Sequence, residues 1–137
     1  MSTGLRRVLA AILLIPAAAF AQAPKKAPAP RAVQTEFEAF IAKFRAALAA
    51  NDSSSIAGMT KLPFMGDKTY ADAARFRAKA YPDFFTAKNR ACIQRTRAVY
   101  DRDGDNNDVY HLSCDGDIFT FTRSPAGFLF TDAGAND

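Results

Sequence analysis

Between two segments of alternating apolar and polar residues lies the dipeptide Asp115-Gly116. A two-residue hairpin turn of this kind needs positive φ at both central positions, which Asp and Gly adopt at low cost. The flanking segments, residues 109–114 and 118–123, alternate as half-buried strands do. A hairpin closed here pairs Cys114 with Asp117 and fixes the register of both strands. The sequence therefore predicts an antiparallel sheet in the second half of the chain.

A second turn, Ser124-Pro125-Ala126-Gly127, precedes another alternating segment at 128–131. It sets Phe121 opposite Phe130 and adds a strand to the meander. One face of the predicted sheet then gathers large apolar side chains: Tyr110, Leu112, Phe119, Phe121, Phe128 and Phe130. We expect this face to pack against helices, because a strand buries one face and leaves the other in water.

The N-terminal residues have the pattern of an export signal. Arg6 and Arg7 precede an apolar stretch at 8–20, and Ala19-Phe20-Ala21 has the small-x-small pattern of a cleavage site. The stretch is shorter than the roughly 20 residues that span a bilayer, so we expect cleavage near Ala21 and no stable membrane anchor. The protein is then periplasmic or secreted. The predicted division is a signal peptide at 1–21, a Pro/Ala-rich linker at 22–32, one domain at 33–133 and a disordered tail at 134–137.

The chain has two cysteines, Cys92 and Cys114, and in an exported protein a disulfide between them is the default expectation. The segment 91–100 also alternates, and a bridge between antiparallel neighbours would set Tyr110 opposite Thr96. Such a bridge should stabilise the fold by roughly 3 kcal/mol in the chain-entropy model. We therefore expect one inter-strand disulfide in a sheet of four or more strands.

The first half of the domain predicts helices. Thr35 and Glu38 form a capping box, and a second box, Thr69-x-x-Asp72, precedes a helix that should kink or restart at Pro82. Apolar residues of the first helix recur at spacings of three and four: Phe37, Phe40, Ile41, Phe44 and Leu48. The fold class predicted is α+β, with N-terminal helices packed on a curved antiparallel sheet.

Charge is distributed unevenly along the chain. Residues 22–100 hold fourteen Lys or Arg against six acidic residues, whereas residues 101–137 hold two against eight. Such asymmetry predicts one basic and one acidic surface, each able to attract a partner of opposite sign, or to attract one another. Basic residues interleaved with aromatics, or a basic helix, would indicate nucleic-acid binding, and the chain shows neither.

The outer face of the predicted sheet is the first candidate for binding. The expected register brings together Arg95, Arg97, His111, Thr120 and Thr122, with Val109 among them. Guanidinium, imidazole and hydroxyl groups on one surface could bind an anionic ligand or an acidic protein. The alternative is that this is only the wet, polar face that antiparallel sheets commonly have.

Motifs for catalysis or metal binding are few. The acidic run 101–108 lacks the Gly at position six and the Glu at position twelve of a calcium loop, so we interpret it as a hairpin turn. His111 is the single histidine available to a Ser-His-acid triad. We therefore predict no catalytic residue, no metal site and no cofactor.

The order of elements resembles the cone-shaped α+β fold of the nuclear transport factor 2-like superfamily, and in particular its small exported bacterial members. The matching segments are Phe37-Glu38-Ala39-Phe40 with Phe44, then 59–64, and then Phe84-Phe85 leading into Cys92-Ile93. The resemblance implies a sheet curled around helices, sometimes with a pocket. Steroid isomerases and polyketide cyclases of that superfamily place Asp, His or Tyr side chains inside the pocket, for which the candidates here are Asp67, Tyr70 and Tyr110.

Three functional hypotheses follow. The first is a non-catalytic binding module that recognises a protein partner or a small anionic ligand, with the outer sheet face as its contact. The alternative is a small-molecule enzyme with acid/base chemistry in the cone, as in isomerases and cyclases. The third is a structural module whose exposed sheet face forms a homodimer.

Overall fold

The computed structural model describes residue 12 and residues 26–135. The predicted cleavage site and most of the predicted signal peptide, together with the start of the linker, lie outside the described residues. In the part that is described, no helix is both long and apolar enough to cross a membrane.

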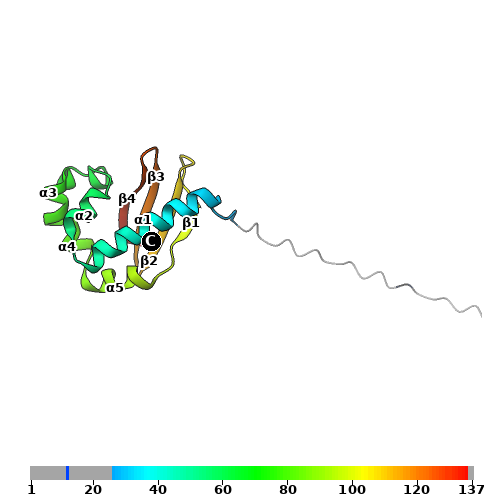
Figure 1. Ribbon diagram of the computed structural model, residues 1–137, viewed down its shortest axis with the longest axis horizontal. Coiled ribbons are helices and arrows are strands. Elements are labelled where there is room, and N and C mark those ends of the chain that lie inside the picture. The colour runs from blue at the N-terminus through cyan, green and yellow to red at the C-terminus, as the bar shows by residue number, and fades with distance from the viewer. Residues whose placement is uncertain (1–11, 13–25, 136–137) are drawn as a thin grey trace, which may run out of the picture.

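Four antiparallel strands form one sheet in the order β1-β2-β3-β4 (Figure 1): β1 Val99–Arg102, β2 Asp108–Cys114, β3 Asp117–Ser124 and β4 Gly127–Ala135. The predicted hairpin register is confirmed, since Cys114 pairs with Asp117, and Phe121 pairs with Phe130. Asp115 has φ of 45° and Gly116 has φ of 95°, as the two-residue turn requires. Residues 134 and 135, which the sequence assigned to a disordered tail, belong to β4.

Helix α1 (Arg31–Ala49) lies across one face of the sheet (Figure 1) and buries its predicted stripe, except for Phe40, which is half-buried. The ring of Phe37 stacks on Tyr110 with centroids 3.7 Å apart, and Phe44 meets Phe121 edge-on at 5.1 Å. The predicted cap at Thr35 is wrong, because the helix begins one turn earlier, directly after Pro30. Proline fits the end of a helix, where its missing N–H is not needed.

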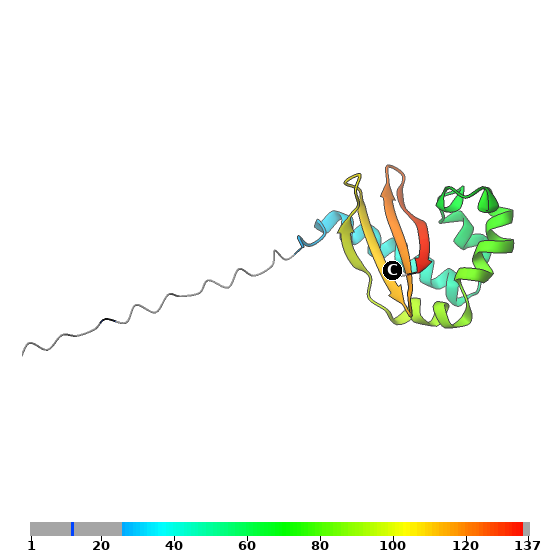
Figure 2. The ribbon, with the colours of Figure 1, turned by 180° about the vertical axis from the view of Figure 1, so that it is seen from behind.

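The rest of the helical half forms a lobe beside the sheet, which we call the helical lobe (residues 52–97). Figures 1 and 2 show it at the end of the molecule away from the start of α1. Its elements are short: α2 Ser53–Gly58, η1 Phe64–Gly66, η2 Lys68–Tyr70, α3 Ala73–Arg75, the π-helical turn η3 Phe76–Ala80, α4 Tyr81–Phe84 and α5 Ala87–Arg95. The lobe joins the sheet at residues 59–61, where Phe130 N donates to Met59 O and Lys61 N donates to Phe130 O.

The lobe has a helix cap and a helix distortion close to the predicted positions, at residues 72 and 76–80. Asp72, rather than Thr69, caps α3, and its carboxylate accepts from the Arg75 N–H at 2.8 Å. The π-helical turn 76–80 ends two residues before Pro82, which has no N–H and whose ring crowds the preceding turn of a regular α-helix. The helix thus accommodates the proline by forming one wider, π-helical turn before it.

The predicted strand at 91–100 is wrong, and the disulfide is therefore not inter-strand. Residues 87–95 form α5, and Cys92 joins this helix to Cys114 on β2, with Cα atoms 5.9 Å apart. The strand β1 begins at Val99, which pairs with His111. The spacing of the buried residues of α5 favours a helix over a strand, because they recur at intervals of three and four residues: Asn89, Cys92 and Ile93.

Contacts at both ends stabilise α5. The Thr86 hydroxyl accepts from the Asn89 N–H at 3.2 Å and caps its first turn. At the other end, the guanidinium of Arg45 on α1 donates to Ile93 O at 2.9 Å and to Thr96 O at 2.6 Å. Satisfied helix ends, together with the bridge to β2, outweigh the weak strand alternation of this segment.

Candidate functional site

The outer face of the sheet brings together only part of the predicted cluster. His111 Nδ1 lies 3.0 Å from Thr120 Oγ1, and Thr122 Oγ1 lies 2.8 Å from Thr131 Oγ1. Figure 2 shows this face without any of the described helices over it. Its polar groups are largely paired with one another across the strands.

Neither predicted arginine is on that face. Arg95 is the last residue of α5, and Arg97 is exposed in the connection to β1. The expectation that Arg95 lies beside His111 is therefore wrong, because it depended on the strand register that the helix replaces. Without these two cations the face loses the chemistry that suggested anion binding. The homodimer through this face stays a prediction.

The three pocket candidates have separate surroundings. Asp67 is exposed and caps η2, where hydrogen bonds from Thr69 hold the pKa of its carboxyl below the usual value. Tyr70 is half-buried against the rings of Phe64 and Phe84. Tyr110 is buried under α1, and this burial, followed by nearby negative charge, raises the pKa of its hydroxyl.

Aromatic side chains fill the space between α1 and the sheet. Among the rings there, Phe44, Phe119, Phe121 and Phe130 are fully buried. In the described part of the chain, no buried side-chain nitrogen or oxygen lacks a hydrogen-bond partner. The predicted residues thus form no polar cavity with groups left free for a substrate.

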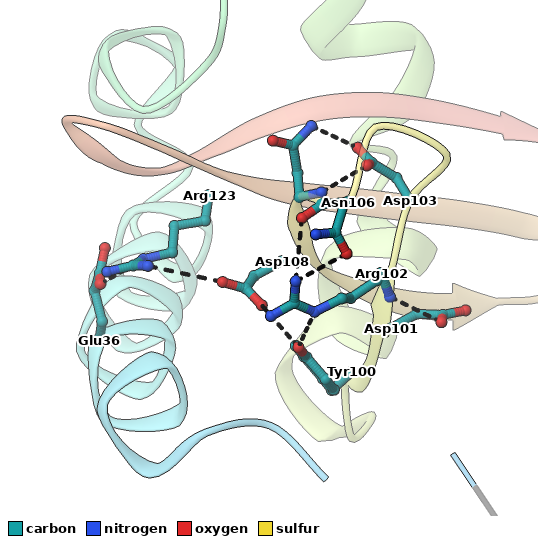
Figure 3. Close-up of polar contacts among 9 residues, drawn as sticks. Glu36, Tyr100, Asp101, Arg102, Asp103, Asn106, Asp108 and Arg123 are labelled. Atoms are coloured by element: carbon teal, nitrogen blue, oxygen red, sulfur yellow. Dashed lines mark hydrogen bonds and ion pairs between the residues drawn. The ribbon is translucent and has the colours of Figure 1, made fainter. Parts of the chain in front are cut away.

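A polar groove of about 300 Å³ lies where α1 meets the tips of two hairpins (Figure 3). It is a shallow feature of the surface, and the sequence analysis did not predict it. Its lining comes from α1, the β1–β2 loop and the β3–β4 turn: Glu36, Asn106, Asn107, Asp108, Arg123, Ser124 and Pro125.

Asp108 is the centre of the network beside this groove, and its side chain is only 12% exposed. Its Oδ1 accepts from the Tyr100 hydroxyl at 2.7 Å and lies 3.4 Å from the Arg102 guanidinium. Its Oδ2 lies 3.7 Å from Arg123, whose Nε donates to Glu36 Oε2 at 2.9 Å. Each guanidinium thus already faces a carboxylate of the same site (Figure 3). The network ties α1 to both hairpins and leaves little free positive charge for a ligand.

The network also changes the acidity of its members. The hydrogen bond to Asp108 raises the pKa of Tyr100, and burial raises it further. Within the β1–β2 loop, Asp103 accepts from Asn107 Nδ2 at 3.0 Å and from the backbone N–H of Asn107 and Asp105, which lowers the pKa of its carboxyl. The acidic run therefore closes a turn with its own side chains, as predicted for a hairpin.

An excess of positive charge lies on the helical lobe. Residues 52–97 hold nine Lys or Arg against four Asp, whereas residues 99–135 hold two Arg against seven Asp. The charges that are unevenly distributed along the sequence are therefore also separated in space, since residues 52–97 form the lobe and residues 99–135 form the sheet (Figure 1).

Five exposed cations between α2 and α4 form what we call the basic surface: Lys61, Lys68, Arg75, Arg77 and Lys79. Arg75 donates to the carbonyl of Lys68 at 3.5 Å, and Arg77 donates to the hydroxyl of Ser54 at 2.8 Å. No salt bridge found among the described residues involves any of the five. The charge count in the sequence was the signal for this surface, but the grouping needed the fold.

The chain matches no known family model, no curated protein and no solved structure. The resemblance to the nuclear transport factor 2-like superfamily accordingly stays a hypothesis.

Proposed function

We propose that this protein is an exported, non-catalytic binding module that recognises an anionic partner through its basic surface. The observation that carries the proposal is the separation of charge between the helical lobe and the sheet. A lobe with a net charge of one sign raises the local concentration of oppositely charged partners and accelerates their association.

Two features favour the basic surface over the other candidates. The guanidiniums beside the groove already face Asp108 and Glu36, so a ligand would have to displace an internal ion pair. The cations of the basic surface face solvent and require no such exchange. Only salt screening weakens the attraction between these cations and an anionic partner.

Export is supported by the Cys92–Cys114 disulfide, because such bonds persist in oxidising compartments and are rare in the cytosol. The Arg6-Arg7 pair followed by the apolar stretch at 8–20 supports the same assignment.

Binding to poly-L-glutamate, a plain polyanion, tests the proposal. The double variant Lys68→Glu/Lys79→Glu should lose roughly tenfold or more in affinity, because two attractions become repulsions. A matched control is Arg31→Glu/Lys43→Glu, which makes the same charge change on exposed positions of α1. Equal losses in the two double variants would mean that net charge alone governs binding, and the proposal would fail.

A further inference from the structure

We infer that the anionic partner is the surface of a phospholipid bilayer, and that Met65 enters the bilayer between the lipid headgroups. The inference rests on the proposed function and adds to it the class of partner. It predicts reversible binding at the membrane surface rather than a stable anchor.

Among the residues that the structure describes, Met65 is one of three large apolar side chains left exposed, with 47% of its surface accessible to solvent. It has φ of 56°, a left-handed conformation that is uncommon for a residue with a long side chain. Neighbouring Gly66, with φ of 68°, continues this tight turn. The backbone thus turns sharply at a point where it leaves an apolar side chain in water.

The base of the Met65 turn is firmly packed. Phe64 is fully buried and contacts Phe76 edge-on at 5.3 Å and Phe130 at 4.9 Å between ring centroids. Asp67 N donates to Phe64 O at 3.0 Å and closes the turn on its other side. Met65 therefore projects from a rigid base, so little backbone conformational entropy is lost when its side chain is buried.

Cations flank Met65 in the sequence. Lys61 comes four residues before Met65 and Lys68 three residues after it, and the guanidinium of Arg75 contacts the backbone of Lys68. Long basic side chains can lay their apolar stems along the interface and keep the charge at the headgroups. Each cation near an anionic membrane surface strengthens binding by about fivefold.

A bilayer matches this combination better than a soluble acidic protein does. The Met65 turn belongs to the helical lobe at one end of the molecule (Figures 1 and 2). A protein partner would need both negative charge and an apolar socket shaped for a single methionine. An anionic bilayer offers negative headgroups over an apolar layer at every point of its surface, as interfacial binding requires.

Vesicle binding tests the inference with the oxidised, processed protein, whose N-terminus is first checked by mass spectrometry. We expect it to sediment with vesicles of phosphatidylglycerol and phosphatidylcholine, to be released by salt, and to stay free of pure phosphatidylcholine. Met65→Ser should weaken this binding by about tenfold, the loss expected on removing most of one buried apolar side chain. Val99→Ser, at the other exposed apolar side chain of the domain, is the control and should change nothing.

A direct readout of insertion is available because the chain has no tryptophan. Met65→Trp should show a blue shift of its emission on adding phosphatidylglycerol vesicles, and Val99→Trp should not. Binding to poly-L-glutamate without binding to vesicles would overturn the membrane inference and leave the proposed function intact. Failure to bind either would overturn both. Vesicle binding that is unchanged in Met65→Ser would overturn the insertion.

Discussion

Cys92 on α5 and Cys114 at the end of β2 are covalently joined, with their Cα atoms 5.9 Å apart. The bond connects the helical lobe to the sheet. The lobe also joins the sheet at residues 59–61, through the hydrogen bonds of Phe130. The disulfide and these hydrogen bonds, together with the stacking of Phe64 on Phe130, hold the helical lobe in place against the sheet.

Removing the disulfide should destabilise the protein markedly. The bond closes a loop with a sequence separation of 22, for which the chain-entropy model gives roughly 3 kcal/mol. Urea unfolding of Cys92→Ser/Cys114→Ser, compared with the oxidised parent, measures the loss. An unchanged midpoint would show that the link does not limit stability, and the reduced parent should match the double variant.

The aromatic interior predicts a second stability effect. Phe44 is fully buried and its ring lies within 5.9 Å, centroid to centroid, of Phe85, Phe121 and Phe130. Phe44→Ala should cost about 3–5 kcal/mol, since the transfer free energy is lost and a cavity remains. Phe40→Ala, at a half-buried position of the same helix, should cost distinctly less by the same unfolding measurement. Equal losses would contradict the packing described.

Sequence patterns predicted the sheet correctly from β2 onward, because turn chemistry and alternation constrained the same register at Asp115-Gly116. They failed at residues 91–95, where alternation over a few residues competes with helix caps that come from distant parts of the chain. The Arg45 guanidinium that satisfies the end of α5 is 48 residues from Ile93 in sequence. No local pattern carries such a contact.

The accuracy of the predicted strand registers decided which candidate site residues were placed correctly. Arg95 and Arg97 were assigned to the sheet face through the wrong register, whereas His111 and Thr120 were paired correctly through the right one. The basic surface was implicit in the charge count, but its members come from three short elements (η2, α3 and η3) and from the connection between α2 and η1. Their grouping depends on the packing of Phe64 and Phe76, which charge patterning does not report.

The hydroxyl of Tyr100 predicts a dependence of stability on alkaline pH. The folded protein raises its pKa above the ordinary 10.0, first through the hydrogen bond to Asp108. A raised pKa favours the neutral form, so this contribution is fully present below the ordinary pKa and is lost as pH rises through the folded pKa. The pKa of Tyr110 is raised as well, so the difference between the near-ultraviolet titrations of the parent and of Tyr100→Phe isolates Tyr100, and this difference should be one phenol that ionises above its ordinary pKa. If the parent differed from Tyr100→Phe only by one tyrosine that ionises at the ordinary pKa, the hydrogen bond between Tyr100 and Asp108 would be contradicted.

Arg123 distinguishes a structural groove from a binding groove. Its guanidinium is partly exposed and pairs with Glu36 and Asp108, so Arg123→Ala should cost at most about 1 kcal/mol of stability. We expect its affinity for poly-L-glutamate to stay within twofold of the parent, roughly the scatter of such measurements. A loss as large as that of Lys68→Glu/Lys79→Glu would move the binding site to the groove.

The most direct measurement of the central claim is a map of backbone amide chemical-shift changes as poly-L-glutamate is added to the isotope-labelled protein. The account predicts that the changes concentrate in residues 61–79 and disappear in Lys68→Glu/Lys79→Glu. Changes centred on β1–β3, or spread evenly over the helical lobe and the sheet, would contradict recognition through the basic surface.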